Sequence, residues 1–273
     1  MAGRILIGTQ GWNYAAWVGP FYPEGTRPAD FLSTYGQAFG TVEVDSTFYA
    51  VPPAATVRGW AERAPDGFVF ALKLPQEVTH ERRLRGADDE VALFLERARL
   101  LEEKLGPVLV QLGPDFSPRE LGALEGFLPR LPGDVRFAVE VRHPRWMRPE
   151  VLLDLLSLLA AHGVALALTD GRWIARDTML ELVQRPTAGF HYLRWMGPDP
   201  GLTDYSRVQL DRSAEMDAWA AALREPPARE MDLYGYANNH FAGHSPASAR
   251  DLQRRLGIRP VPPGQIGAQI SLF

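Results

Sequence analysis

Eight short runs of apolar or alternating residues recur along the whole chain, and stretches with helical periodicity separate most of them. The strand-like runs are 5–8, 41–45, 68–74, 108–112, 135–141, 164–169, 189–195 and 231–236, and the helical stretches are 28–39, 54–64, 88–105, 118–131, 149–162, 213–223 and 246–256. Consecutive strands joined by a crossing helix lie parallel. The pattern therefore predicts an α/β fold, a single TIM-like (β/α)8 barrel with a parallel eight-stranded sheet and outer helices.

An open doubly wound sheet is the alternative fold for such a chain. That fold places a glycine-rich phosphate-binding turn after its first strand. Here the segment Gly8-Thr9-Gln10-Gly11-Trp12 lacks the GxGxxG spacing and continues into an aromatic loop, which favours the barrel. A chain of 273 residues also suits one barrel, so we expect one domain over 1–273, with a proline- and glycine-rich tail at about 259–273.

Composition excludes several classes of protein. The chain has no cysteine, which excludes disulfides, thiolate metal sites and cysteine nucleophiles. It contains no signal peptide and no apolar run of membrane-spanning length, so we expect a cytoplasmic protein without a membrane partner. The formal net charge of −4 does not require a polyanionic partner, although a basic mouth can still form locally.

Charged side chains alternate with apolar ones near the ends of several strands. Alternate strand residues face the barrel interior, and the long connections at 9–27, 75–87 and 196–212 all follow strands, so we expect a site at the mouth formed by the carboxyl ends of the strands. We assign catalysis to Glu43, Lys73, Glu140 and Arg194. The two glutamates would transfer protons, while Lys73 and Arg194 would stabilise developing negative charge. The alternative is that these groups form structural ion pairs that close the top of the barrel.

Two strands leave further alternatives open. Lysine is rare in this arginine-rich chain, where only Lys73 and Lys104 occur among 29 basic residues. Lys73 can serve as a base, as a Schiff-base amine or as a phosphate contact, or it can form an ordinary ion pair. Lys104 is expected on the surface. On the seventh strand the inward residues are Tyr192 and Arg194 in one phase, and His191 in the other.

Aromatic and polar residues crowd the strand ends and the loops that follow them. The residues expected to bind substrate are Trp12, Tyr14, Asp45, Thr47, Tyr49, His80, Gln111, Arg142, His143, Trp146, Tyr236, Asn238, Asn239 and His244. Aromatic rings interleaved with basic groups suit sugars or bases, and Arg82, Arg83 and Arg85 add a basic run nearby. The alternative is that the aromatic residues pack the long loops onto the barrel.

No cofactor is predicted. The sequence contains no redox-cofactor fingerprint, P-loop or GxSxG motif, and no HExxH or other compact metal-ligand set. A divalent metal is the minor alternative, because five histidines fall near the expected mouth: His80, His143, His191, His240 and His244.

Several of these segments together resemble a known family. They are Gly8-Thr9-Gln10-Gly11-Trp12-Asn13-Tyr14, Glu43-Val44-Asp45-Ser46-Thr47-Phe48-Tyr49, Ala138-Val139-Glu140-Val141-Arg142-His143, and Asn238-Asn239 with Gly243-His244. With them the chain resembles the YecE-like proteins, domain of unknown function 72, although the family usually has serine at Gln10 and often asparagine at Asp45. The resemblance implies a TIM-barrel-like fold and no established activity. Metal-dependent AP endonucleases have a related barrel, but this chain lacks their dense ligand set, so we carry over no metal.

Three functions follow from these features. The leading hypothesis is an enzyme, a hydrolase or lyase that acts on an anionic, phosphate-containing or sugar-containing small molecule at the mouth. The alternative is a nucleic-acid binder for single-stranded or damaged DNA or RNA, with or without phosphodiesterase activity, whose affinity would fall steeply with salt. A third possibility is a barrel kept as an interaction scaffold, which requires exposed apolar patches.

Overall fold

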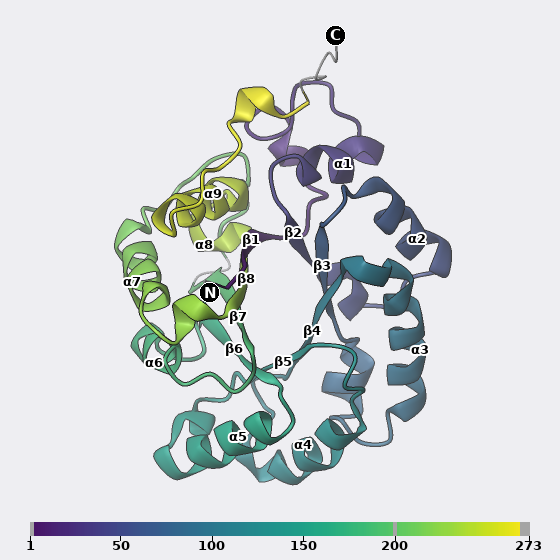
Figure 1. The fold of residues 1–273 in the computed structure, drawn as a ribbon, viewed down its shortest axis with the longest axis vertical. Helices are drawn as coiled ribbons and strands as arrows, with labels where there is room; N and C mark the ends of the chain where they lie inside the picture. Colours follow the sequence, from purple (N-terminus) through teal and green to yellow (C-terminus); the bar gives the residue numbers. More distant parts are fainter. Residues whose placement is uncertain (1–2, 199–200, 268–273) are drawn as a thin grey trace.

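Eight parallel strands close into one barrel in the computed structural model, which describes residues 3–198 and 201–267. The strands follow chain order and are β1 (Ile5–Gln10), β2 (Thr41–Val44), β3 (Val69–Lys73), β4 (Leu105–Gln111), β5 (Phe137–Glu140), β6 (Ala165–Gly171), β7 (Phe190–Gly197) and β8 (Asp232–Ala237). Figure 1 looks along the barrel, with the helices around its outside. The predicted TIM-like α/β barrel is confirmed, and the doubly wound alternative is wrong.

Helices cover the outside of the barrel and are mostly shorter than predicted. They are α1 (Phe31–Gly36), α2 (Ala54–Arg63), α3 (Asp88–Ala98), α4 (Leu121–Phe127), α5 (Pro149–Ala161), α6 (Arg176–Leu182), α7 (Ser213–Arg224), α8 (Asn239–Ala242) and α9 (Ser245–Arg255). The predicted helix 88–105 ends early, because a 3-10 segment follows Ala98 and β4 already begins at Leu105. The sequence pattern does not predict α6 or α8, because their 7 and 4 residues are too few to show helical periodicity.

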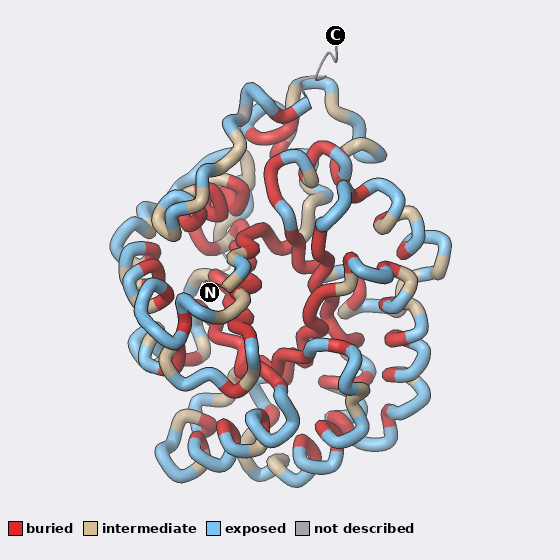
Figure 2. The backbone as a smooth tube through the Cα atoms, in the orientation of Figure 1, coloured by how far each residue is buried: buried red, intermediate tan, exposed pale blue. Residues whose placement is uncertain are grey.

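The barrel interior is filled by side chains of complementary size. Small residues point inward on β3, β5 and β6, and large aromatic residues point inward on β7 and β8. The interior cluster contains Leu6, Val69, Ala71, Leu109, Ala138, Ala165, Ala167, Phe190, Tyr192, Tyr234 and Tyr236. Because alanines face aromatic rings, the barrel interior that these residues fill is a packed core rather than a channel. Figure 2 shows the strands buried and the outer faces of the helices exposed.

The residues of opposite phase pack against the helices. On β6, Asp170 points outward and its carboxylate accepts from Arg176 Nε and Trp219 Nε1, both at 2.7 Å, which joins α6 and α7 to the barrel. On β7, His191 is buried on the outer side and Arg194 lies inside with Tyr192. Among the helices of the described ranges, none combines the length and the apolar character needed to cross a membrane.

Candidate active site

A layer of charged side chains lies inside the barrel at the carboxyl ends of β2, β5 and β7. Arg194 on β7 is 1% exposed, and it contacts two carboxylates that are each 0% exposed. Its Nη2 and Nε donate to Oε1 and Oε2 of Glu43 on β2, at 2.7 and 2.9 Å. Its Nη1 donates to Oε2 of Glu140 on β5. One guanidinium group therefore joins the ends of three strands.

Further side chains donate hydrogen bonds to both carboxylates. Glu43 also accepts from Tyr192 OH at 2.6 Å and from Gln10 Nε2. Glu140 Oε1 accepts from Arg142 Nε at 2.6 Å. The network extends beyond these residues, because Arg142 Nη2 donates to Gln111 Oε1 at 2.8 Å and Asn238 Nδ2 donates to Gln10 Oε1.

The two carboxylates have opposite electrostatic environments. Burial, reinforced by nearby Asp45, raises the pKa of Glu43 to about 7 against the opposing charge of Arg194. Burial acts in the same direction on Glu140, but Arg194 and Arg142 outweigh it and lower the pKa of Glu140 to about 2. Neither glutamate presents surface to solvent. This geometry agrees with structural ion pairs at the top of the barrel.

Lys73 has a different environment. It is the last residue of β3 and is 7% exposed, and Thr47 Oγ1 holds its backbone by donating to Lys73 O at 2.8 Å. Its Nζ lies 3.8 Å from the centre of the Phe48 ring, and no carboxylate of the described residues forms an ion pair with it. Burial and the charge of Arg194 lower the pKa of Lys73 to about 8, although Asp45 opposes the shift.

Lys104 is not the surface residue that the sequence analysis expects. It is 9% exposed, and its Nζ donates to the carbonyl oxygens of Ala61 and Ala64 at 2.7 and 2.8 Å, at the end of α2. The last carbonyl groups of a helix have no partner within the helix, so this amine satisfies them. The two lysines therefore differ: Lys104 has a structural role, whereas no carbonyl oxygen of the described residues accepts from the Lys73 amine.

Asp45 and His80 flank the Lys73 amine. The Asp45 side chain is 35% exposed, and its Oδ1 lies 4.0 Å from Arg194 Nη2. The His80 ring centre lies 5.1 Å from that of Phe48. Burial and the charge of Lys73 lower the pKa of His80, so its imidazole is neutral at pH 7. This part of the mouth therefore combines a carboxylate, an amine with a lowered pKa and a neutral imidazole.

Most other residues predicted to bind substrate contact protein groups instead. Tyr49, by contrast, is 72% exposed. Trp146 is 0% exposed, and its Nε1 donates to Phe116 O at 2.8 Å. Residues of this kind with partners in the loops or the barrel wall are Trp12 against Trp60, Tyr14 against Trp17 and Tyr205, Tyr236 on Thr41, His143 on the Arg145 backbone, Asn239 on Ser245 and His244 on the Tyr205 backbone. For these residues the geometry agrees with the alternative in which they pack the loops.

The basic run after β3 is paired with acids. Arg82 contacts Glu77 and Glu90, Arg83 contacts Asp115 and Glu120, and Arg85 contacts Glu120. The run therefore offers little uncompensated positive charge to a polyanion.

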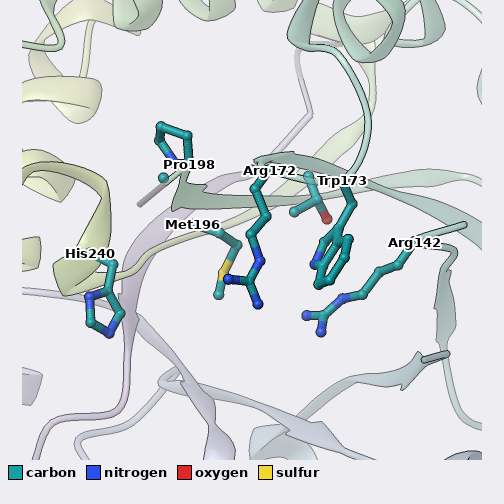
Figure 3. Close-up of a pocket in the computed structure, with 9 residues that line it drawn as sticks. Arg142, Arg172, Trp173, Met196, Pro198 and His240 are labelled. Carbon is teal, nitrogen blue, oxygen red and sulfur yellow. The ribbon is translucent and has the colours of Figure 1, made fainter. Parts of the chain in front are cut away.

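A pocket of about 160 Å³, which the sequence analysis missed, opens beside the charged layer between the ends of β6 and β7. Its walls include Arg142, Thr169, Arg172, Trp173, Met196 and His240 (Figure 3). Arg172 and Trp173 follow β6 in a short join to α6. The predicted strand 164–169 ends just before them, and α6 has too few turns to reveal that a mouth loop lies there. In the sequence, Arg172 and Trp173 directly after a predicted strand could have indicated a mouth loop at this position.

No cluster within 3–198 and 201–267 brings together three or more histidine, aspartate and glutamate side chains in a position to hold a metal ion. His191 faces the helices, where burial lowers its pKa to about 4. The mouth carboxylates Glu43 and Glu140 contact arginine instead.

Proteins similar to this chain come from several bacteria. UPF0759 protein YecE from Escherichia coli (strain K12) is 38% identical over 169 residues, which are 62% of this chain and 60% of YecE. The match thus spans less than two thirds of the length of that relative. UPF0759 protein YunF from Bacillus subtilis (strain 168) is 27% identical over 286 residues, covering 98% of this chain and 100% of YunF.

Solved structures share the fold. A DUF72 family protein from Thermotoga maritima superposes with a TM-score of 0.75 at 24% identity, covering 93% of this chain and 99% of that one. A DUF72 family protein from Enterococcus faecalis gives 0.71 at 20% identity, covering 94% and 98%. The family described as "Protein of unknown function DUF72" matches residues 6–267. This chain therefore belongs to the DUF72 family, as the resemblance of its motifs to YecE-like proteins predicts.

Proposed function

We propose that the protein is an enzyme that transfers protons at the barrel mouth, a hydrolase or lyase for an anionic or sugar-containing small molecule. The observation that carries the proposal is the Lys73 amine, which lies against Phe48 without an acidic partner among the described residues. With a pKa of about 8, roughly a tenth of it is unprotonated at pH 7, far more than for an ordinary lysine. Such an amine can act as a general base.

The surroundings of Lys73 support this role. Its Nζ would take a proton from a substrate C–H group or from an attacking water molecule. In an elimination, the electron pair of the C–H bond forms the new double bond and the leaving group departs with its own pair. In a hydrolysis, the water oxygen attacks the electrophilic centre while its proton passes to Lys73, and the bond to the leaving group breaks with its electron pair going to that group, which then takes up a proton. Asp45, the acid with the largest effect on Lys73, would stabilise the resulting ammonium.

Glu43, Glu140 and Arg194 have supporting roles in this proposal. The sequence analysis assigned proton transfer to the two glutamates, but both are 0% exposed and their oxygens accept from several donors. They would hold Arg194 in place, and the charge of Arg194 in turn lowers the pKa of Lys73. All three are therefore positioning residues rather than groups that touch substrate.

Amine labelling tests the ionisation of Lys73 before any substrate is known. The chain has only two lysines, so acetylation by acetic anhydride can be followed at each one by peptide mass spectrometry. We expect the labelling rate of Lys73 to rise with pH around a midpoint near 8, because only the unprotonated amine reacts. Lys104 is the internal control. A midpoint for Lys73 near the ordinary lysine value would remove the basis of the proposal.

A turnover screen tests the reaction. Sugar phosphates, sugar acids and simple glycosides are incubated with the protein, and products are followed by NMR. Any activity found should fall about 100-fold or more in Lys73→Met, because a general base contributes about this much. Arg58→Gln, on the exposed side of α2, should retain it. Full turnover by Lys73→Met would show that Lys73 is not the base.

Nucleic-acid binding has less support, because Arg82, Arg83 and Arg85 are paired with acids. Titration with a labelled single-stranded oligonucleotide at two salt concentrations distinguishes the hypotheses. A nucleic-acid binder loses affinity steeply as salt rises. A small-molecule site binds a mononucleotide as well as it binds the oligonucleotide.

A further inference from the structure

The pocket between β6 and β7 contains strong hydrogen-bond donors that lack acceptors. Arg172 directly follows β6, and its guanidinium carbon lies 4.5 Å from the centre of the Trp173 ring. No acid within the described ranges pairs with Arg172. Arg142 uses Nε on Glu140 and Nη2 on Gln111, which leaves its Nη1 without a partner in that part of the chain.

Two residues that line the pocket also carry buried polar atoms without partners in the described part of the chain. Thr169 is 9% exposed, and its Oγ1 has no hydrogen-bond partner among the residues described. The same holds for Nδ1 of His240. Buried polar atoms are nearly always satisfied in folded proteins, so two unsatisfied atoms at one pocket indicate a ligand or water that completes them.

The pocket is also positively charged. Figure 3 shows the guanidinium groups of Arg142 and Arg172 extending to the same side of the pocket beside the Trp173 ring. None of the described residues that line it is an aspartate or a glutamate. Arg142 shares the Glu140 carboxylate with Arg194, and Arg172 has no acid to pair with among the described residues, so an anion between the two guanidinium groups is stabilised.

We propose that this pocket binds the phosphoryl group of a phosphate monoester. A monoester has three terminal oxygens and a charge near −2 at neutral pH, which matches the guanidinium fork of Arg172 together with Arg142 Nη1, whereas a carboxylate has only the two oxygens that the Arg172 fork already binds. A volume of about 160 Å³ suits a phosphoryl group with a small sugar or alcohol attached. That this ester is the substrate rests on the proposed function, whereas the anion site rests on the pocket alone.

Arg142 connects the pocket to the charged layer. It lines the pocket, and its Nε donates to Glu140, whose other oxygen accepts from Arg194. Lys73 is the last residue of β3, which pairs with β2 beside Glu43 of that layer. An ester anchored by its phosphoryl group would therefore extend its organic part over the charged layer towards Lys73.

Calorimetric titration tests the pocket with ribose 5-phosphate, inorganic phosphate, ribose and malate as probes. We expect both phosphate compounds to bind and ribose not to bind. Arg172→Gln should weaken ribose 5-phosphate binding about tenfold or more, because it removes charge-assisted hydrogen bonds. Arg172 is exposed, so its replacement spares the fold. Thr169→Val should have a smaller effect, and Arg58→Gln, the matched charge control on α2, should have none.

The outcomes separate the two proposals. Lys73→Met should lose turnover yet keep its affinity for ribose 5-phosphate. The pocket assignment is overturned if Arg172→Gln and Arg58→Gln bind this ester equally well, if malate binds more tightly than the ester, or if neither phosphate compound binds. None of these results bears on the labelling of Lys73. The proposed function would therefore remain open to test even if the pocket did not bind a phosphate monoester.

Discussion

The side chain of Lys73 has a pKa of about 8, well below the ordinary value for lysine. Lysine is rare in this chain, and that rarity marks Lys73 and Lys104 equally. Their partners distinguish them: the Lys104 amine donates to two carbonyl oxygens, while the Lys73 amine lies against an aromatic ring beside a network of other charges. Burying an incompletely paired ammonium is unfavourable, so a role in catalysis would come at the expense of stability.

Lys73→Met should therefore stabilise the protein at pH 7. The pKa of Lys73 is about 8 in the folded chain against 10.5 for the model amine, so between these pH values the unfolded chain binds more protons and stability rises with pH. Below pH 8 the full cost, on the order of 3 kcal/mol, is present, and methionine removes it. Urea unfolding at pH 7 and pH 10 should show the advantage of the variant shrinking at the higher pH. A variant that is less stable than the parent at pH 7 would contradict this account.

At the scale of elements, the ends of β2, β5 and β7 behave as one unit because Arg194 holds both Glu43 and Glu140. The alternation of charged and apolar residues predicts that each of these side chains points inward. It does not predict which strands meet across the barrel, because that depends on closure. Barrel closure also explains why the sequence pattern did not indicate Arg172 and Trp173. Their loop forms a pocket only because closure places it beside Arg142.

Arg194→Met should strongly destabilise this unit. The change leaves the buried carboxylate of Glu43 without its cation and Glu140 with Arg142 alone, which costs about 3–5 kcal/mol. Arg99→Met is the matched control, because the Arg99 and Asp134 side chains are 45% and 63% exposed and an exposed pair contributes about 0–1 kcal/mol. Urea unfolding measures both variants. Equal losses in the two would show that the network contributes no more than a surface pair.

At the scale of the whole molecule, barrel closure depends on close approach at β1. This strand pairs with β8 along Ile5–Thr9 and with β2 at Thr9 and Gln10. A Cβ added at Gly8 would overlap the carbonyl oxygen of Thr41 and lie 2.9 Å from the Tyr35 hydroxyl. Backbone atoms cannot move aside as a flexible side chain can, so glycine is required where the first strand meets the second.

Gly8→Ala should therefore loosen the barrel, with a loss of about 1–3 kcal/mol in the free energy of unfolding, as for other overpacked sites. Gly126→Ala is the matched control: Gly126 lies within α4 and its added Cβ would meet nothing within 4 Å, so alanine should be neutral or stabilise by about 0.5–1 kcal/mol. Thermal unfolding of both variants provides the measurement. An unchanged Gly8→Ala protein would mean that β1 can shift without cost.

The sequence by itself determined the barrel, because helical and strand periodicities are local properties that alternate along the chain. It also determined that Glu43, Lys73, Glu140 and Arg194 approach one end, because alternate strand residues face inward. Only the tertiary structure decided which charges neutralise one another. Closure brings Arg194 within hydrogen-bond distance of both glutamates, and it leaves Lys73 and Arg172 without acidic partners among the described residues. The reason is physical: pairing depends on distances across the barrel between strands far apart in the chain, and periodicity contains no information about those distances.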